Sequence, residues 1–397
     1  MDIKEIIEEK IDQIAEAIVS IESDNYITNN FIGDKLGAAL FLVYYSKYKQ
    51  KQKYYNIGFE FISEIFDVYS SDFSNPLGLS KFGWFVEHLS KNDFISIDTN
   101  YALSDIDEFL FSIMIKTAQD GNYDFLHGAI SYGLYFLNRV PNRKTDKYLG
   151  ELITTLEKTC IDSGNNQKKW LSVLNSEKDL SGYNISLSHG IASLIVFFSK
   201  IYNRNIERDK TSILLKGSIK YLINQKLDIT KYNSFFSMWA KESMDKITSS
   251  RLAWCYGDLG IAVSMWHSSQ VLNDRKLEND AISIFLHSSK RKKLDENGVI
   301  DAGFCHGTSG IAHIFNRMYG YTGIEELKVA SNYWFLQTLK MSQFKDGIAG
   351  YKTWLTERYG GWKNNISLLE GVSGIGLTMI SAVSNIEPTW DECLLLS

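Results

Sequence analysis

The sequence has very few prolines: 3 among 397 residues, where the usual abundance of about 5% would give roughly 20. Glycine is present in ordinary number, with 28 residues. Because proline interrupts helix interiors and glycine ends helices without strain, this combination predicts many long helices joined by glycine-bearing turns. It argues against an all-β sandwich.

The chain also lacks an excess of positive charge, long apolar runs and a cysteine framework. Its 42 basic and 47 acidic residues give a net charge of −5, which argues against a nucleic-acid partner. The longest apolar run, at 191–198, is far shorter than the roughly 18 residues of a membrane span, and the first residues do not resemble a secretory signal. With 4 cysteines, we predict a cytoplasmic protein without a membrane anchor, in which Cys160 and Cys393 are small core residues.

One pattern recurs seven times along the chain. A small or turn residue is followed by two variable residues, a second small residue and then an apolar run. Clear copies carry the pairs Gly257/Gly260, Gly307/Gly310 and Gly371/Gly374, weaker copies carry Gly128/Ser131 and Gly190/Ser193, and degenerate copies carry Asp34/Gly37 and Ser80/Gly83. Such spacing is typical of helical repeats with extra material in some copies.

The segments between the apolar runs are amphipathic. Leu215, Ile219, Leu222 and Ile223 fall on one face of the stretch 207–225. Inner apolar helices that alternate with outer amphipathic ones describe an all-α protein, an α/α toroid of seven helix-pair repeats in a single domain, 1–397. In that ring the turn before every inner helix lies at the same end, so residues just before each first glycine converge.

The stretch at about 226–250 fits the repeat poorly. Its sequence, KLDITKYNSFFSMWAKESMDKITSS, has no clear helical stripe. We interpret it as an insertion, a small appended subdomain that binds substrate.

Two cysteines and a histidine occupy equivalent turns of adjacent repeats. Cys255 stands two positions before Gly257, Cys305 two positions before Gly307, and His306 follows Cys305. Two cysteines and one histidine, with no fourth protein ligand, are the composition of a catalytic zinc site with one open position. The alternative is that both cysteines are small side chains packed in tight turns.

Other polar residues share this end of the repeats. His189 immediately precedes a repeat glycine, as do His127 and Glu370, while Asp124 and Arg251 each lie four residues before a repeat glycine or cysteine. His189 is the stronger acid–base candidate and His127 the weaker one. Asp124 could equally cap a helix, Arg251 could be a solvated charge, and Glu370 could be structural.

The motifs RLAWCYGDLG, SLSHG, CHGTSG and LLEGVSGIG resemble those of the lanthionine synthetase C-like (LanC) family, in particular its stand-alone lantibiotic cyclases. The resemblance covers essentially the whole chain. It implies an α/α toroid with an inserted peptide-binding subdomain. It also implies Zn²⁺ held by Cys255, Cys305 and His306, acid–base or charge-stabilising roles for Asp124, His189 and Arg251, and substrate contacts for Trp254 and Tyr256.

In that family the substrate is a precursor peptide whose serines or threonines have been dehydrated, and the cyclase joins peptide cysteines to the dehydro residues as thioethers. The resemblance thus implies a lantibiotic dehydratase and an ABC transporter as partners, through which the chain would reach the membrane. The roles of Asp124, His189 and Arg251 as acid, base and enolate stabiliser are interchangeable at this stage.

Two other functions are compatible with the same residues. A zinc-dependent prenyltransferase would also activate a peptide thiol on an α/α toroid, but it needs a basic surface for diphosphate that the sequence does not reveal. A non-catalytic LanC-like protein would use zinc only to hold thiols.

Overall fold

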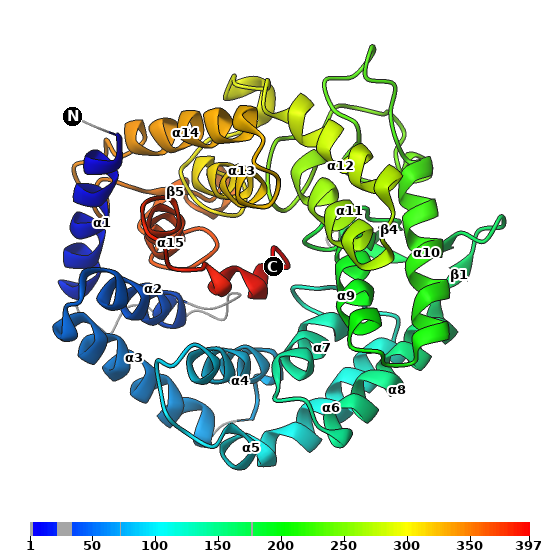
Figure 1. Ribbon diagram of the computed structural model, residues 1–397, viewed down its shortest axis with the longest axis horizontal. Helices are drawn as coiled ribbons and strands as arrows, with labels where there is room; N and C mark the ends of the chain where they lie inside the picture. Colours follow the sequence, from blue (N-terminus) through cyan, green and yellow to red (C-terminus); the bar gives the residue numbers. More distant parts are fainter. Residues whose placement is uncertain (1–2, 22–33, 72, 176–177) are drawn as a thin grey trace.

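The computed structural model describes residues 3–21, 34–71, 73–175 and 178–397. Two concentric rings of helices dominate this part of the chain (Figure 1). The inner ring consists of α2 (Asp34–Lys49), α4 (Pro76–Lys91), α7 (Ala129–Asn138), α9 (Ile191–Asn203), α11 (Asp258–Leu272), α13 (Thr308–Thr322) and α15 (Val372–Val383). The outer ring consists of α1 (Ile3–Val19), α3 (Gln52–Ser71), α6 (Ser104–Gln119), α8 (Arg143–Thr159), α10 (Arg208–Asn224), α12 (Arg275–Ser288) and α14 (Glu325–Lys340), with the short α5 (Thr99–Ala102) before α6.

The first and last helices close the ring. The N-terminal α1 packs against α15, and α15 packs against both α2 and α13. The described residues therefore form the predicted α/α toroid, with seven inner and seven outer helices.

Burial follows the predicted division between inner and outer helices. Nearly every residue of the inner α9 is buried. On the outer α10, Leu215, Ile219 and Leu222 are buried, but Ile223 is 37% exposed. Ile223 immediately follows Leu222, so the 100° rotation per residue turns it away from the ring.

The repeated glycines explain how the turns close. Gly128, Gly190, Gly257, Gly307 and Gly371 are the N-cap residues of α7, α9, α11, α13 and α15. The second glycine of the clear copies packs on its own turn: a Cβ at Gly310 would overlap the carbonyl oxygen of Phe304, and one at Gly374 that of Leu368. Both carbonyls lie six residues earlier, so the motif encodes one turn geometry.

The second copy is aligned differently from our prediction. We expected a turn at Ser80, but α4 already begins at Pro76, and Ser80 and Gly83 lie inside it. The Asn75 side chain accepts a hydrogen bond from the Gly78 N–H, and proline is favourable in the first helical turn. These local signals, and not the small-residue pair, determine where α4 starts.

Besides the helices, the described residues form three antiparallel hairpins and several short 3₁₀ turns. The strands are β1 (Ile161–Asp162) with β2 (Lys168–Lys169), β3 (Ser172–Asn175) with β4 (Leu180–Gly182), and β5 (Thr353–Trp354) with β6 (Trp362–Lys363). The 3₁₀ turns are η2 (Lys241–Ser243), η3 (Asp295–Asn297), η4 (Glu357–Tyr359) and η5 (Thr389–Leu394).

The stretch 226–250 contains no α-helix, and its only regular element is η2. It packs onto the ring: Phe236 and Ala240 are fully buried, and the backbone N–H groups of Phe235 and Phe236 donate to the Asp258 carboxylate, each over 3.0 Å. The stretch is thus tied to the first turn of α11. Over the described residues, no helix combines the length and the apolar character that a membrane crossing requires.

Candidate metal centre

Hydrogen bonds join the turns before α9, α11, α13 and α15 in series. The N–H groups of Leu187 and Ser188 donate to the carbonyl of Cys255, over 3.2 and 3.3 Å. The Cys255 N–H donates to the carbonyl of Cys305 over 3.3 Å, and the Cys305 N–H to that of Leu369 over 2.7 Å. Because each turn supports the next, the positions before the glycines are held side by side at one end of the ring.

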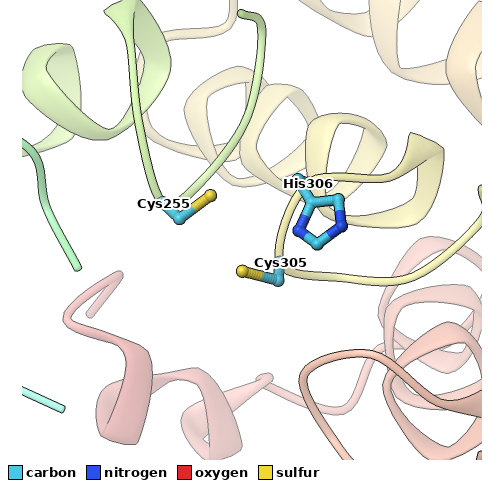
Figure 2. Close-up of side chains that lie close together, drawn as sticks. All are labelled: Cys255, Cys305 and His306. Carbon is cyan, nitrogen blue, oxygen red and sulfur yellow. The ribbon is translucent and has the colours of Figure 1, made fainter. Parts of the chain in front are cut away.

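This arrangement brings Cys255, Cys305 and His306 together. Their ligand atoms all lie within 4.8 Å of one another. Figure 2 shows Cys255 on the loop before α11 and the other two residues on the loop before α13, with the two sulfurs facing each other. Cys255 is buried, while Cys305 and His306 are partly exposed. The predicted convergence of these three side chains is present, and the group could bind a metal ion.

The charge state of the three side chains fits a cation. A hydrogen bond from Cys305 and the charge of His306 hold the pKa of Cys255 well below its usual value, although burial opposes this. The same contact with Cys255, together with burial, raises the pKa of Cys305 well above its usual value. Without a metal, ionisation of one thiol disfavours ionisation of the other, because the two negative charges would repel each other. A divalent cation would allow both to ionise, and thiolate and imidazole donors suit such a metal.

Asp124 and His189 form a second pair at the same end of the ring. Asp124 Oδ2 lies 2.7 Å from His189 Nδ1. Burial would raise the pKa of Asp124, but its hydrogen bond with His189 holds it below the usual value. Burial would lower the pKa of His189, but the hydrogen bond and charge of Asp124 raise it above 6.5. The pair thus favours an imidazolium beside a carboxylate.

The remaining polar candidates interact with these two groups. His127 is exposed, and its ring stacks 5.7 Å from that of His189. Arg251 is exposed, and its positive charge helps to lower the pKa of Cys255. Glu370 precedes Gly371, and its negative charge helps to raise the pKa of Cys305. The carbonyl of Glu370 accepts a hydrogen bond from the Thr353 hydroxyl over 2.6 Å.

The two aromatic residues beside Cys255 have different surroundings. Tyr256 is partly exposed, and its hydroxyl accepts a hydrogen bond from Asn184 Nδ2 over 3.2 Å. Trp254 has no exposed surface, and its Nε1 donates to the carbonyl of Leu394 over 2.9 Å. Only Tyr256 of the two is therefore placed to meet a substrate without rearrangement.

A cavity of about 850 Å³ opens beside the Asp124–His189 pair. His127 and Tyr256 line it, together with residues 171–175 around β3 and with Arg358 and Tyr359 of η4. The glycine repeat does not predict the cavity residues from β3 and η4. Both come from segments outside the repeat, and no spacing in the sequence relates them to the glycine turns.

Comparisons with known proteins agree with this architecture. The model of the family described as lanthionine synthetase C-like protein matches residues 35–395. The nisin biosynthesis protein NisC of Lactococcus lactis subsp. lactis is 25% identical over 227 residues, which are 54% of this chain and 48% of that protein. The match therefore spans about half the length of this curated relative. The solved structure of a nisin cyclase is similar over 99% of this chain and 97% of its own, with a TM-score of 0.71 and 18% identity. On the extent of the family match, this chain belongs to the lanthionine synthetase C-like family.

Proposed function

We propose that this protein is a zinc-dependent lantibiotic cyclase that forms lanthionine and methyllanthionine rings in a dehydrated precursor peptide. The observation that carries the proposal is the group of Cys255, Cys305 and His306, whose ligand atoms lie within 4.8 Å of one another. Three protein ligands leave a fourth position open for a substrate thiol, as in catalytic zinc sites. Membership of the LanC-like family supports the same activity.

The reaction needs a thiolate and a proton donor. Zn²⁺ bound by the three residues would lower the pKa of a substrate cysteine, because metal coordination deprotonates thiols. The peptide sulfur then adds to the β-carbon of dehydroalanine or dehydrobutyrine, and the electrons of the carbon–carbon double bond move into an enolate. A proton delivered to the α-carbon completes the thioether. The peptide thus loses the thiol hydrogen and gains one hydrogen at the α-carbon, so the cyclic peptide has the same mass as the linear one.

We propose that His189 delivers the proton and that Asp124 orients the His189 imidazole. Asp124 Oδ1 accepts the N–H groups of Leu126 and His127, over 2.7 and 2.9 Å, and Oδ2 faces His189. A carboxylate engaged on both oxygens, with a lowered pKa, is a weak base. His189, with Nδ1 held by Asp124 and a raised pKa, is a suitable acid through Nε2.

The remaining assignments follow from exposure and charge. The exposed Arg251 would stabilise the enolate oxygen, and Tyr256 would contact the peptide. The cavity of about 850 Å³ beside them is large enough for a peptide segment. We extend the proposal to the stretch 226–250 as a peptide-binding insertion. We also propose a cytoplasmic assembly with a lantibiotic dehydratase and an ABC transporter, which would bring the chain to the membrane surface.

Incubation with zinc and a dehydrated precursor peptide tests the activity. Each ring removes one thiol that iodoacetamide can alkylate and leaves the peptide mass unchanged, so mass spectrometry after alkylation counts the rings. We expect rapid loss of alkylatable thiols with the wild-type protein, and only the slow uncatalysed background with Cys305→Ala.

Tandem mass spectrometry then distinguishes rings from other products, because a thioether prevents backbone fragmentation between the joined residues. If the wild-type protein retains zinc but peptide thiols persist at the background rate, the cyclase assignment is wrong. The non-catalytic thiol-binding function would then be favoured.

A further inference from the structure

The last residues of the chain occupy the interior of the toroid. Residues 388–396, which we call the closing segment, contain η5 and lie inside the ring of inner helices (Figure 1). Trp390, Leu394, Leu395 and Leu396 are each at most 3% exposed. None of the predicted metal ligands or acid–base residues belongs to this segment, so its burial needs a separate explanation.

The closing segment contacts the turn that carries the first ligand. Trp254 immediately precedes Cys255 and is fully buried. Its indole N–H donates to the carbonyl of Leu394 over 2.9 Å. This bond satisfies the buried indole N–H and fixes Trp254 and, with it, the backbone that leads into Cys255.

The same segment contacts the turn that carries the second ligand. Phe304 immediately precedes Cys305 and is fully buried. The ring of Trp390 meets that of Phe304 edge to face at a centroid distance of 5.8 Å, and the ring of Trp254 meets Phe304 at 6.1 Å. The residue before each ligating cysteine is thus packed in one aromatic cluster of Trp254, Phe304 and Trp390.

An ion pair and a hydrogen bond hold the closing segment in this place. Asp391 has no exposed surface. Its Oδ2 lies 2.8 Å from His313 Nε2 and 3.0 Å from Arg317 Nε, and both partners belong to α13, the helix that follows Cys305 and His306. On α11, His267 Nε2 lies 3.1 Å from the carbonyl oxygen of Leu396. The segment is therefore bound to α11 and α13, the two helices whose preceding loops carry the proposed metal ligands.

We propose that the closing segment sets the separation of the Cys255 and Cys305 sulfurs, with Trp390 and Asp391 as positioning residues for the metal centre. A metal site tolerates only small errors in ligand distance, and the two ligand loops come from different repeats. The aromatic cluster couples these loops to a single element in the middle of the ring. The inference rests on the metal centre of the proposed function.

Full-length Trp390→Phe, Asp391→Asn and Trp334→Phe variants test this role. Trp334 is a fully buried tryptophan of the outer helix α14, so it controls for the general effect of a smaller core side chain. Competition with a chromophoric chelator gives zinc affinity. We expect a loss of about ten- to hundredfold for Trp390→Phe and Asp391→Asn, the range found when the supports of metal ligands are removed, and no loss for Trp334→Phe.

A second measurement uses the metal-free protein. Diamide can join Cys255 to Cys305, and peptide mapping follows the rate of this disulfide. We expect slower joining in Trp390→Phe and Asp391→Asn than in Trp334→Phe, because displaced turns separate the sulfurs. Asp391→Asn keeps the shape of its side chain, so it provides the test should Trp390→Phe fail to fold.

The outcomes separate the two proposals. Equal zinc affinity in all variants, or an equal loss in Trp390→Phe and Trp334→Phe, would overturn the positioning role. A wild-type protein that binds no zinc would overturn the proposed function, while the diamide rates would still decide whether the closing segment positions the two cysteines.

Discussion

Asp124 Oδ2 lies 2.7 Å from His189 Nδ1, although 65 positions separate the two residues in the chain. They come from the turns before α7 and α9, neighbouring helices of the inner ring. Two backbone N–H groups hold the other Asp124 oxygen. The imidazole therefore meets a carboxylate that is already fixed in position.

This contact predicts a pH-dependent effect of Asp124→Asn. Asp124 raises the pKa of His189, so the wild-type imidazole stays protonated to a higher pH than an isolated histidine. Without the carboxylate the pKa of His189 falls, and the loss of cyclisation rate with rising pH begins at a lower pH. We expect a rate reduced by about 10²–10⁴-fold, the usual contribution of a proton donor.

Cyclisation rates from pH 5 to 9 would measure the shift. Asp120→Asn is the matched control, because Asp120 is exposed and lines the same cavity; its profile should coincide with that of the wild type. An unchanged profile in Asp124→Asn would remove His189 from the proton-delivery step.

Metal content provides the test of the three ligands. We expect about one zinc per chain in the wild-type protein and loss of zinc in Cys305→Ala, because two remaining protein ligands are too few for a stable site. Cys160→Ala controls for the removal of a partly buried thiol away from the group. Elemental mass spectrometry on freshly purified protein measures both, and zinc retained in Cys305→Ala would contradict the assignment.

Removing the cation of a buried ion cluster should strongly destabilise the protein. Arg139, which is 1% exposed, pairs with Glu87 of α4 and, over 3.1 Å, with Asp107 of α6. Arg139→Met leaves both carboxylates buried without a cation, so the free energy of unfolding should fall by about 3–5 kcal/mol. The exposed pair of Lys144 and Glu108 is the control: Lys144→Met should cost less than about 1 kcal/mol. Urea denaturation measures both changes.

Replacing Lys81 should stabilise the protein at neutral pH, whereas replacing Arg139 should destabilise it. Burial in α4 lowers its pKa to about 7, although the charge of Asp124 opposes this. The unfolded chain keeps the ordinary value of 10.5 and binds the proton more tightly, so wild-type stability rises between about pH 7 and 10.5 through this residue. Lys81→Met should therefore be more stable than the wild type at pH 7, with a difference that shrinks towards pH 10.

Urea denaturation of both proteins at several pH values gives this difference directly. The exposed Lys216 of α10 supplies the control variant Lys216→Met, which should show no such trend. A stability difference independent of pH would mean that Lys81 keeps its proton in the folded protein throughout this range.

The repeat and the convergence of Cys255, Cys305 and His306 could be predicted from the sequence because they depend on local rules. At Gly310 and Gly374 a Cβ would overlap a carbonyl six residues earlier, so these turns require glycine and leave a pattern that is visible in the sequence. Equivalent turns of a closed ring lie at the same end, so the proximity of Cys255 and Cys305 could be predicted before the structure was known. Apolar periodicity likewise indicated which helices face inward.

Contacts between segments that share no period could be found only in the folded protein. The burial of Trp254 against Leu394 and the cavity wall formed by β3 and η4 both belong to this class. The ring and the end at which its polar residues gather follow from local patterns in the sequence, because helical periodicity and turn geometry are local. What fills the centre of the ring depends on packing between residues far apart in the chain, which no local pattern records.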